Sequence, residues 1–140
     1  MRETVISNIK LRFDSISDIA TSIDPDIADT HLQVPKSKSV SDHMWCIVGA
    51  RESYARALHA GHWVGFACSL DSIQSLTEIK NKLVSSKREA EHAFDQITDW
   101  SAQRDELLLG LLEHETTHEG QLIRHLLALE QTIPKSVKWA

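Results

Sequence analysis

The sequence contains few cysteines and few prolines. Of its 140 residues, two are cysteine and three are proline. Cys46 and Cys68 belong to no C-x-x-C pair and to no regular disulfide framework, and a reducing compartment fits this usage. A fold that depends on disulfide bonds is therefore disfavoured.

Long apolar runs and an excess of basic residues are also missing. No apolar run approaches the ~20 residues that are needed to span a bilayer, and the charges within Met1–Ile23 do not follow a signal-peptide layout. The net charge of -5, from 20 acidic and 15 basic residues, leaves no basic face for nucleic acid. We therefore expect a cytoplasmic protein that binds neither a membrane nor nucleic acid.

The residues that are present suit one helical domain over residues 1–140. The chain is 41% hydrophobic and 25% charged, which is ordinary for a globular protein, and its length is typical of one domain. We find no internal repeat and no sustained alternation of apolar and polar residues of the kind that indicates a strand. The fold class is therefore predicted to be all-α.

The first two helices have clear sequence boundaries. The apolar positions before Asp24 recur at steps of three or four, which predicts an amphipathic helix: Val5, Ile9, Phe13, Ile16, Ala20 and Ile23. Pro25 disfavours its continuation, and the polar stretch 29–39 is long enough for a crossover between non-adjacent helix ends. Ser39 and Asp42 resemble a capping box, so a second helix should begin near Val40 and break at the glycines Gly61 and Gly65.

Two further helices follow. Asp71 or Ser69 is a plausible cap for the third, which has apolar positions at Ile73, Leu76, Leu83, Ala90, Phe94 and Ile97. A fourth should run from about Asp99 to about Glu130. Four helices of roughly 20 to 30 residues predict a four-helix bundle.

Histidine is the residue type in excess, with eight in the chain. His114 and His118 are four residues apart, a spacing that places both imidazoles on one face of a helix where they can bind one metal ion. His43 lies on the predicted inner stripe of the second helix and could supply a third ligand. Simpler readings stay open, because the pair could be a coincidence on a half-exposed helix and His43 a hydrogen-bonded core residue.

The segment His114–His118 also reads H-E-x-x-H, the zinc-binding pattern of many metalloproteases. Arg124 stands where the extended protease pattern needs a histidine, and beyond Glu119 the only acid is Glu130. Glu115 projects about 100° around the helix from His114, which makes it a poor general base for an ion held there. A protease is therefore disfavoured.

Three segments together resemble the DinB family of bacterial metal-binding proteins. His114–Ile123 has the histidine pair followed by Gly-Gln and an apolar pair, Pro134–Trp139 has a proline-then-tryptophan ending, and Val40–His43 places a histidine early in the second helix. The resemblance covers nearly the whole chain. It implies a four-helix bundle with a long crossover after the first helix, and usually a homodimer. Zinc or nickel is then the expected ion, held by His43, His114 and His118.

The resemblance also implies a range of functions. Characterised relatives include metal-dependent thiol S-transferases and isomerases that use a low-molecular-weight thiol such as bacillithiol or mycothiol, and a metal-bound thiol is readily deprotonated. A non-catalytic metal-binding or stress-response bundle is the alternative, and a metal-dependent hydrolase is a third hypothesis. Either enzyme would need a small-molecule substrate. His125 lies roughly 10 Å along the helix from His118, too far to share an ion, and is expected to be a pocket or interface residue.

Overall fold

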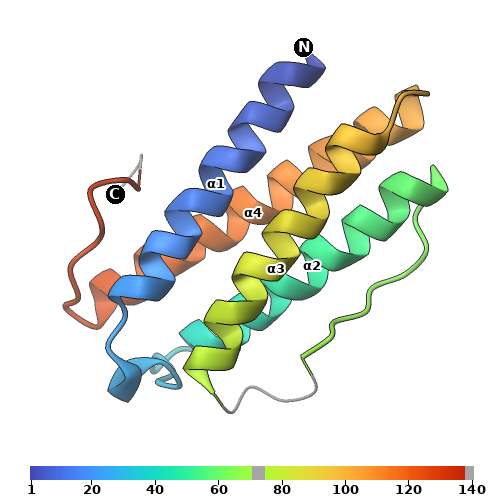
Figure 1. The fold of residues 1–140 in the computed structure, drawn as a ribbon. Helices are drawn as coiled ribbons and strands as arrows, with labels where there is room; N and C mark the ends of the chain where they lie inside the picture. The colour runs from blue at the N-terminus through green and yellow to red at the C-terminus, as the bar shows by residue number, and fades with distance from the viewer. Residues whose placement is uncertain (71–74, 138–140) are drawn as a thin grey trace.

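The computed structural model describes residues 1–70 and 75–137, and within these ranges the chain is helical with no strand. The described elements are α1 (Arg2–Ser22), the short 3-10 helix η1 (Pro25–Ile27), α2 (Val40–Ala60), α3 (Leu76–Gln96) and α4 (Ala102–Ala128) (Figure 1). The predicted four-helix bundle is confirmed. No helix in the described ranges is long and apolar enough to cross a membrane.

The ends of α2 follow the residues that predicted them. The Ser39 hydroxyl accepts a hydrogen bond from the Asp42 backbone N–H at 3.1 Å, and the Asp42 carboxylate accepts one from the Ser39 N–H at 2.9 Å. This is a complete capping box, which satisfies two backbone donors that the first turn leaves free. Gly61 ends the helix with φ +79°, a conformation that glycine adopts at little cost.

The start of α3 differs from the prediction. Ser75 is its N-cap, accepting a hydrogen bond from the Glu78 N–H, so Ser69 is not the cap. Ser69 has another role, because its N–H and hydroxyl both donate to the Glu52 carboxylate, at 2.8 and 2.6 Å. The other candidate cap, Asp71, and the predicted apolar residue Ile73 lie outside the described residues.

Each helix packs on two others, and the connections follow from that arrangement. Helices α1 and α2 lie diagonally across the bundle, and each packs against both α3 and α4 (Figure 1). The long connection of residues 23–39 therefore joins diagonal partners, as a crossover. Helices α2 and α3 run in the same direction, so the chain must return along the bundle between them.

The described part of that return, residues 61–70, forms a strap along α2. The Ser53 hydroxyl donates to the Ala67 carbonyl and accepts from the Ala67 N–H, at 3.1 and 3.0 Å. The Trp45 indole N–H donates to the Leu70 carbonyl at 3.0 Å. Phe66 packs directly over Gly49, where the absence of a side chain leaves room for its ring. The strap is thus fixed by both hydrogen bonds and packing.

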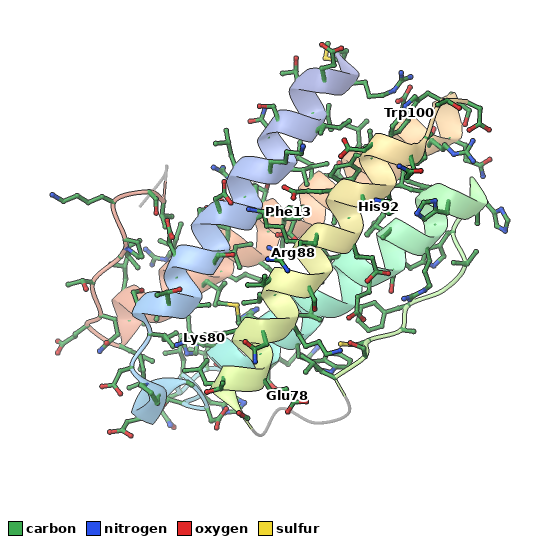
Figure 2. The ribbon with its side chains drawn as sticks, in the orientation of Figure 1. Phe13, Glu78, Lys80, Arg88, His92 and Trp100 are labelled. Carbon is green, nitrogen blue, oxygen red and sulfur yellow. The ribbon has the colours of Figure 1, made fainter. Side chains whose placement is uncertain are left out.

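The core consists of two apolar clusters. The larger lies around the α1–α2 crossover and includes Ile16, Ile19, Met44, Ile47, Leu83 and Leu122. The smaller lies toward the other end and includes Ile9, Phe13, Leu58, Phe94, Leu108 and Leu111. On all four helices the residues between the clusters include buried polar side chains: Arg12, Ser15, Arg51, Ser86, Glu115 and Glu119. A polar layer therefore divides the core. The outward face of α3 is by contrast charged, with Glu78, Lys80, Arg88 and His92 along it (Figure 2).

Replacing Gly49 by alanine tests the packing of the strap. An added Cβ would lie 2.3 Å from Phe66 Cζ and 3.0 Å from Cys68 Cβ, so the strap must shift. We expect Gly49→Ala to lower the free energy of unfolding, measured with urea, despite the better helix propensity of alanine. The matched control is Gly120→Ala in α4, where a Cβ meets nothing within 4 Å. It should gain about 0.5–1 kcal/mol. Equal effects at the two glycines would contradict this packing.

Candidate metal site

The structure brings His43 of α2 against His118 of α4. Both side chains are buried, with exposures of 6% and 8%. Their Nδ1 atoms are 2.9 Å apart, and their ring centroids are 5.2 Å apart in an edge-to-face arrangement. Two residues 75 positions apart in the sequence therefore point the same ring atom at each other.

His114 completes the group of three that the sequence predicted. Its ring lies 4.4 Å from that of His118, centroid to centroid, one helical turn away on the same face of α4. Its Nδ1 is buried and has no hydrogen-bond partner within residues 1–70 and 75–137. A buried ring nitrogen normally has a partner, so this atom is free to bind something else.

His125 lies beside the group, as a pocket residue, and the remaining histidines are at the surface. His125 lines the pocket next to the group, 6.4 Å from His43 between ring centroids, and its Nε2 donates to the Thr30 carbonyl at 2.9 Å. The bond ties α4 to the α1–α2 crossover and occupies one of the two ring nitrogens of His125. The other four histidines are exposed: His31, His59, His62 and His92.

Burial keeps the three grouped imidazoles neutral. Desolvation is the largest cause, and it lowers the pKa of His43 and of His114 to about 4, from an ordinary 6.5. For His118 desolvation acts together with the two neighbouring imidazoles, and the pKa falls to about 3. The positive charge of Lys38 lowers the pKa of all three imidazoles further. The neutral ring is the form that binds a metal ion.

The donor set fits a divalent ion, although it is not a ready-made cage. Two nitrogens bound to one ion at about 2.0–2.1 Å lie about 2.9 Å apart at right angles and about 3.3–3.4 Å apart at the tetrahedral angle. The separation of 2.9 Å between His43 and His118 is close to the first value. No three His, Cys, Asp or Glu side chains in residues 1–70 and 75–137 are already arranged around one point. A shared ion would therefore require the imidazoles to turn. The hydrogen bond between His43 Nδ1 and His118 Nδ1 would break, whereas His114 Nδ1 has no hydrogen bond to lose within the described residues.

His43, His118 and His125 line a pocket of about 710 Å³ between α4 and the crossover. The outward residues of α4 complete their side, and Leu32 and residues 34–38 of the crossover line the other. Lys38 reaches over α2, where its ammonium donates to the Cys46 thiol at 3.3 Å. The volume lies within the range of small-molecule sites, so a ligand could reach the histidines.

The glutamates on α4 point away from this pocket. Glu115 is fully buried, and its two carboxylate oxygens accept hydrogen bonds from Arg51 at 2.9 and 2.8 Å. Glu119 lies 3.1 Å from Arg12 Nε and accepts a hydrogen bond of 2.5 Å from the Ser15 hydroxyl. Because Glu115 is held in the core by a buried arginine, it cannot serve as the base that a metalloprotease needs from H-E-x-x-H.

These ion pairs are functional neighbours that the sequence predictions missed. Arg51 also donates to the Leu83 carbonyl and stacks on Phe13, with its guanidinium carbon 4.2 Å from the ring centroid. The available signal was Arg51 itself, a charged residue directly after the apolar Ala50, together with two glutamates four residues apart on the fourth helix. Charged residues of this kind usually face solvent, so the sequence did not indicate that Arg51 and Glu115 form an ion pair in the core.

No protein-family model matches the chain, and no curated protein matches it in sequence. The likeness to the DinB family thus stays a prediction that depends on the motifs around the three histidines.

The low pKa values of the histidines predict how the metal-free protein responds to acid. In the unfolded chain these imidazoles gain a proton near pH 6.5, whereas in the folded chain they stay neutral to about pH 4. The unfolded state therefore binds more protons across this window, and stability falls as the pH is lowered through it. The slope can reach about 1.4 kcal/mol per pH unit for each histidine. Urea unfolding at pH 7 and at pH 5, with a chelator present, measures this slope. His118→Gln should reduce the slope, and the exposed His92→Gln should leave it unchanged.

Removing the charge of Glu115 tests the ion pair. Glu115→Gln leaves Arg51 buried without a counter-charge, and we expect it to cost about 3–5 kcal/mol of unfolding free energy. The exposed Glu113→Gln on the same helix should change stability by less than about 0.5 kcal/mol. The double variant Arg51→Met with Glu115→Leu should recover most of the loss, since it leaves no unpaired charge. A mild effect of Glu115→Gln alone would refute a structural role for the pair.

Proposed function

We propose that this chain binds one divalent metal ion through His43, His114 and His118 and uses it on a small molecule held in the adjoining pocket. The proposal is supported by His118, whose ring meets His43 of α2 and His114 of α4, and by the buried His114 Nδ1, which has no partner among the described residues. His43 and His118 also line the adjoining pocket. A histidine kept only for packing would have its ring nitrogens satisfied. Three ligands would leave coordination positions for a substrate.

Zinc or nickel is the ion that we propose, because neutral imidazole suits both and the resemblance to the DinB family implies them. When bound, such an ion would act as a Lewis acid or stabilise the thiolate of a thiol ligand. The residues of the chain itself supply the remaining functions. His43 and the α4 pair would bind the ion, and the His125 bond to Thr30 holds the crossover against the pocket.

Transfer to or from a thiol suits the site better than hydrolysis does. Hydrolysis at a metal usually needs a general base close to the bound water, and both nearby glutamates, Glu115 and Glu119, are held in the core by arginines. A thiolate made by coordination is already a nucleophile and needs no such base. This supports a metal-dependent thiol S-transferase, the activity implied by the resemblance, over the metal-dependent hydrolase.

A non-catalytic metal-binding protein is the second candidate. The histidines come from α2 and α4, so an ion held between them would join two helices and stabilise the bundle without any turnover. Activity separates the two candidates. A thiol-dependent reaction with a panel of electrophiles, lost in His118→Gln, would favour the enzyme, while metal-linked stability without turnover would favour the binding protein.

Metal content tests the proposal. We expect protein purified without a histidine tag to hold close to one zinc or nickel per chain by elemental analysis. His43→Gln, His114→Gln and His118→Gln should each lose most of it, and each should also lose the rise in thermal midpoint on adding the ion. The matched control is His92→Gln on the exposed face of α3. Wild-type protein that stays empty after metal loading would refute the site.

A further inference from the structure

The pocket over the histidines has cations at its mouth and no acid. Lys36, Lys38 and Arg124 line it, and the described ranges contribute no aspartate or glutamate to its lining. The chain as a whole carries a net charge of -5, so a random patch of its surface would tend to be acidic. The charged residues of this pocket are therefore positive although the net charge of the protein is negative, and this concentrates anions there.

The three cations are also not neutralised by the protein. Among the described residues several arginines pair with carboxylates, as Arg2 does with Asp105 and Arg51 with Glu115. Lys36, Lys38 and Arg124 form no such ion pair within the described part of the chain. Their charges are consequently available to a ligand.

The backbone of the crossover holds Lys36 at the rim in an unfavourable conformation. Its φ is +59°, in the left-handed region that residues with a side chain rarely adopt. The turn around it is closed by the Ser37 N–H donating to the Val34 carbonyl at 3.3 Å and by the Leu32 N–H donating to the Ser37 hydroxyl at 2.9 Å. Such local strain is concentrated at ligand-binding sites more than elsewhere.

Uncharged polar groups lie beside the cations. Thr116, Thr117 and Gln121 on the outward face of α4 line the same pocket. Hydroxyl and amide groups can donate to an acceptor oxygen without adding charge, and the guanidinium of Arg124 can bind two oxygens of one carboxylate or phosphate. The pocket thus offers hydrogen-bond donors beside its cations.

We infer that the pocket selects a small organic anion, whose carboxylate or phosphate oxygens are bound by Lys38 and Arg124 while its reactive end faces the histidines. A volume of about 710 Å³ fits a metabolite-sized molecule and not a nucleic acid or a protein segment. The inference deepens the proposed function and rests on it, since it names the charge of the substrate that the same site would use. The pocket charges themselves do not depend on a bound ion.

The test uses metal-free protein, so that it can fail separately from the metal site. ¹⁵N NMR titrations at pH 7 and constant ionic strength follow the backbone amides of residues 116–121 with three probes: succinate, its neutral analogue succinamide, and inorganic phosphate. Succinate or phosphate should shift these amides, the better of the two identifying the preferred head group, and succinamide should not. Lys38→Gln and Arg124→Gln should each weaken anion binding at least tenfold.

Arg88→Gln is the matched control, because it removes the same charge from the outward face of α3, away from the pocket (Figure 2). It should leave anion binding unchanged. Three results would each overturn the inference. Succinamide could bind as tightly as succinate, neither anion could shift the amides, or Arg88→Gln could lose as much anion affinity as the pocket variants. Protein that holds its metal but shows one of these results would refute the anion preference and leave the metal site standing.

Discussion

The buried ion pair between Arg51 and Glu115 is the interaction on which the arrangement of α4 depends. Both side chains are completely inaccessible, so neither charge can turn to water, and their paired hydrogen bonds fix α4 against α2. Arg12 and Glu119 form a second buried ion pair, between α1 and α4 and one helical turn further on, with 3.1 Å between Arg12 Nε and Glu119 Oε2. With two glutamates held in the core, the rotation of α4 about its axis is set.

The histidine site follows from that rotation. His114 and His118 each precede one of the two glutamates, so they lie about 100° around the helix from the core-facing acids. That angle directs the imidazoles to the seam between α4 and α2, where His43 meets them. Apolar packing alone would fix this rotation less well, because the residues of an apolar stripe can repack with little cost. Burying the polar layer thus costs desolvation free energy, but the layer specifies the direction in which the histidines point.

Much of this arrangement could be predicted from sequence because it depends on local periodicity. The stripe from Val5 to Ile23, the Ser39 capping box and the spacing of His114 and His118 each reflect a repeat of 3.6 residues or a short-range hydrogen bond. What could not be predicted depends on contacts distant in sequence. Ser69 was predicted as a possible cap and instead binds Glu52, and nothing near Arg51 in the sequence indicates its pairing with Glu115, 64 residues away. The strap along α2 has the same origin, since nothing local shows that α2 and α3 are parallel.

We propose that His43, His114 and His118 share one metal ion, and anomalous diffraction would locate that ion without any assay of activity. Crystals grown with zinc should give a single strong peak at the zinc absorption edge, about 2.0–2.1 Å from one nitrogen of each of the three rings. If no peak lies between α2 and α4, or if a peak lies only at exposed histidines such as His59 and His62, then the three buried histidines do not share an ion.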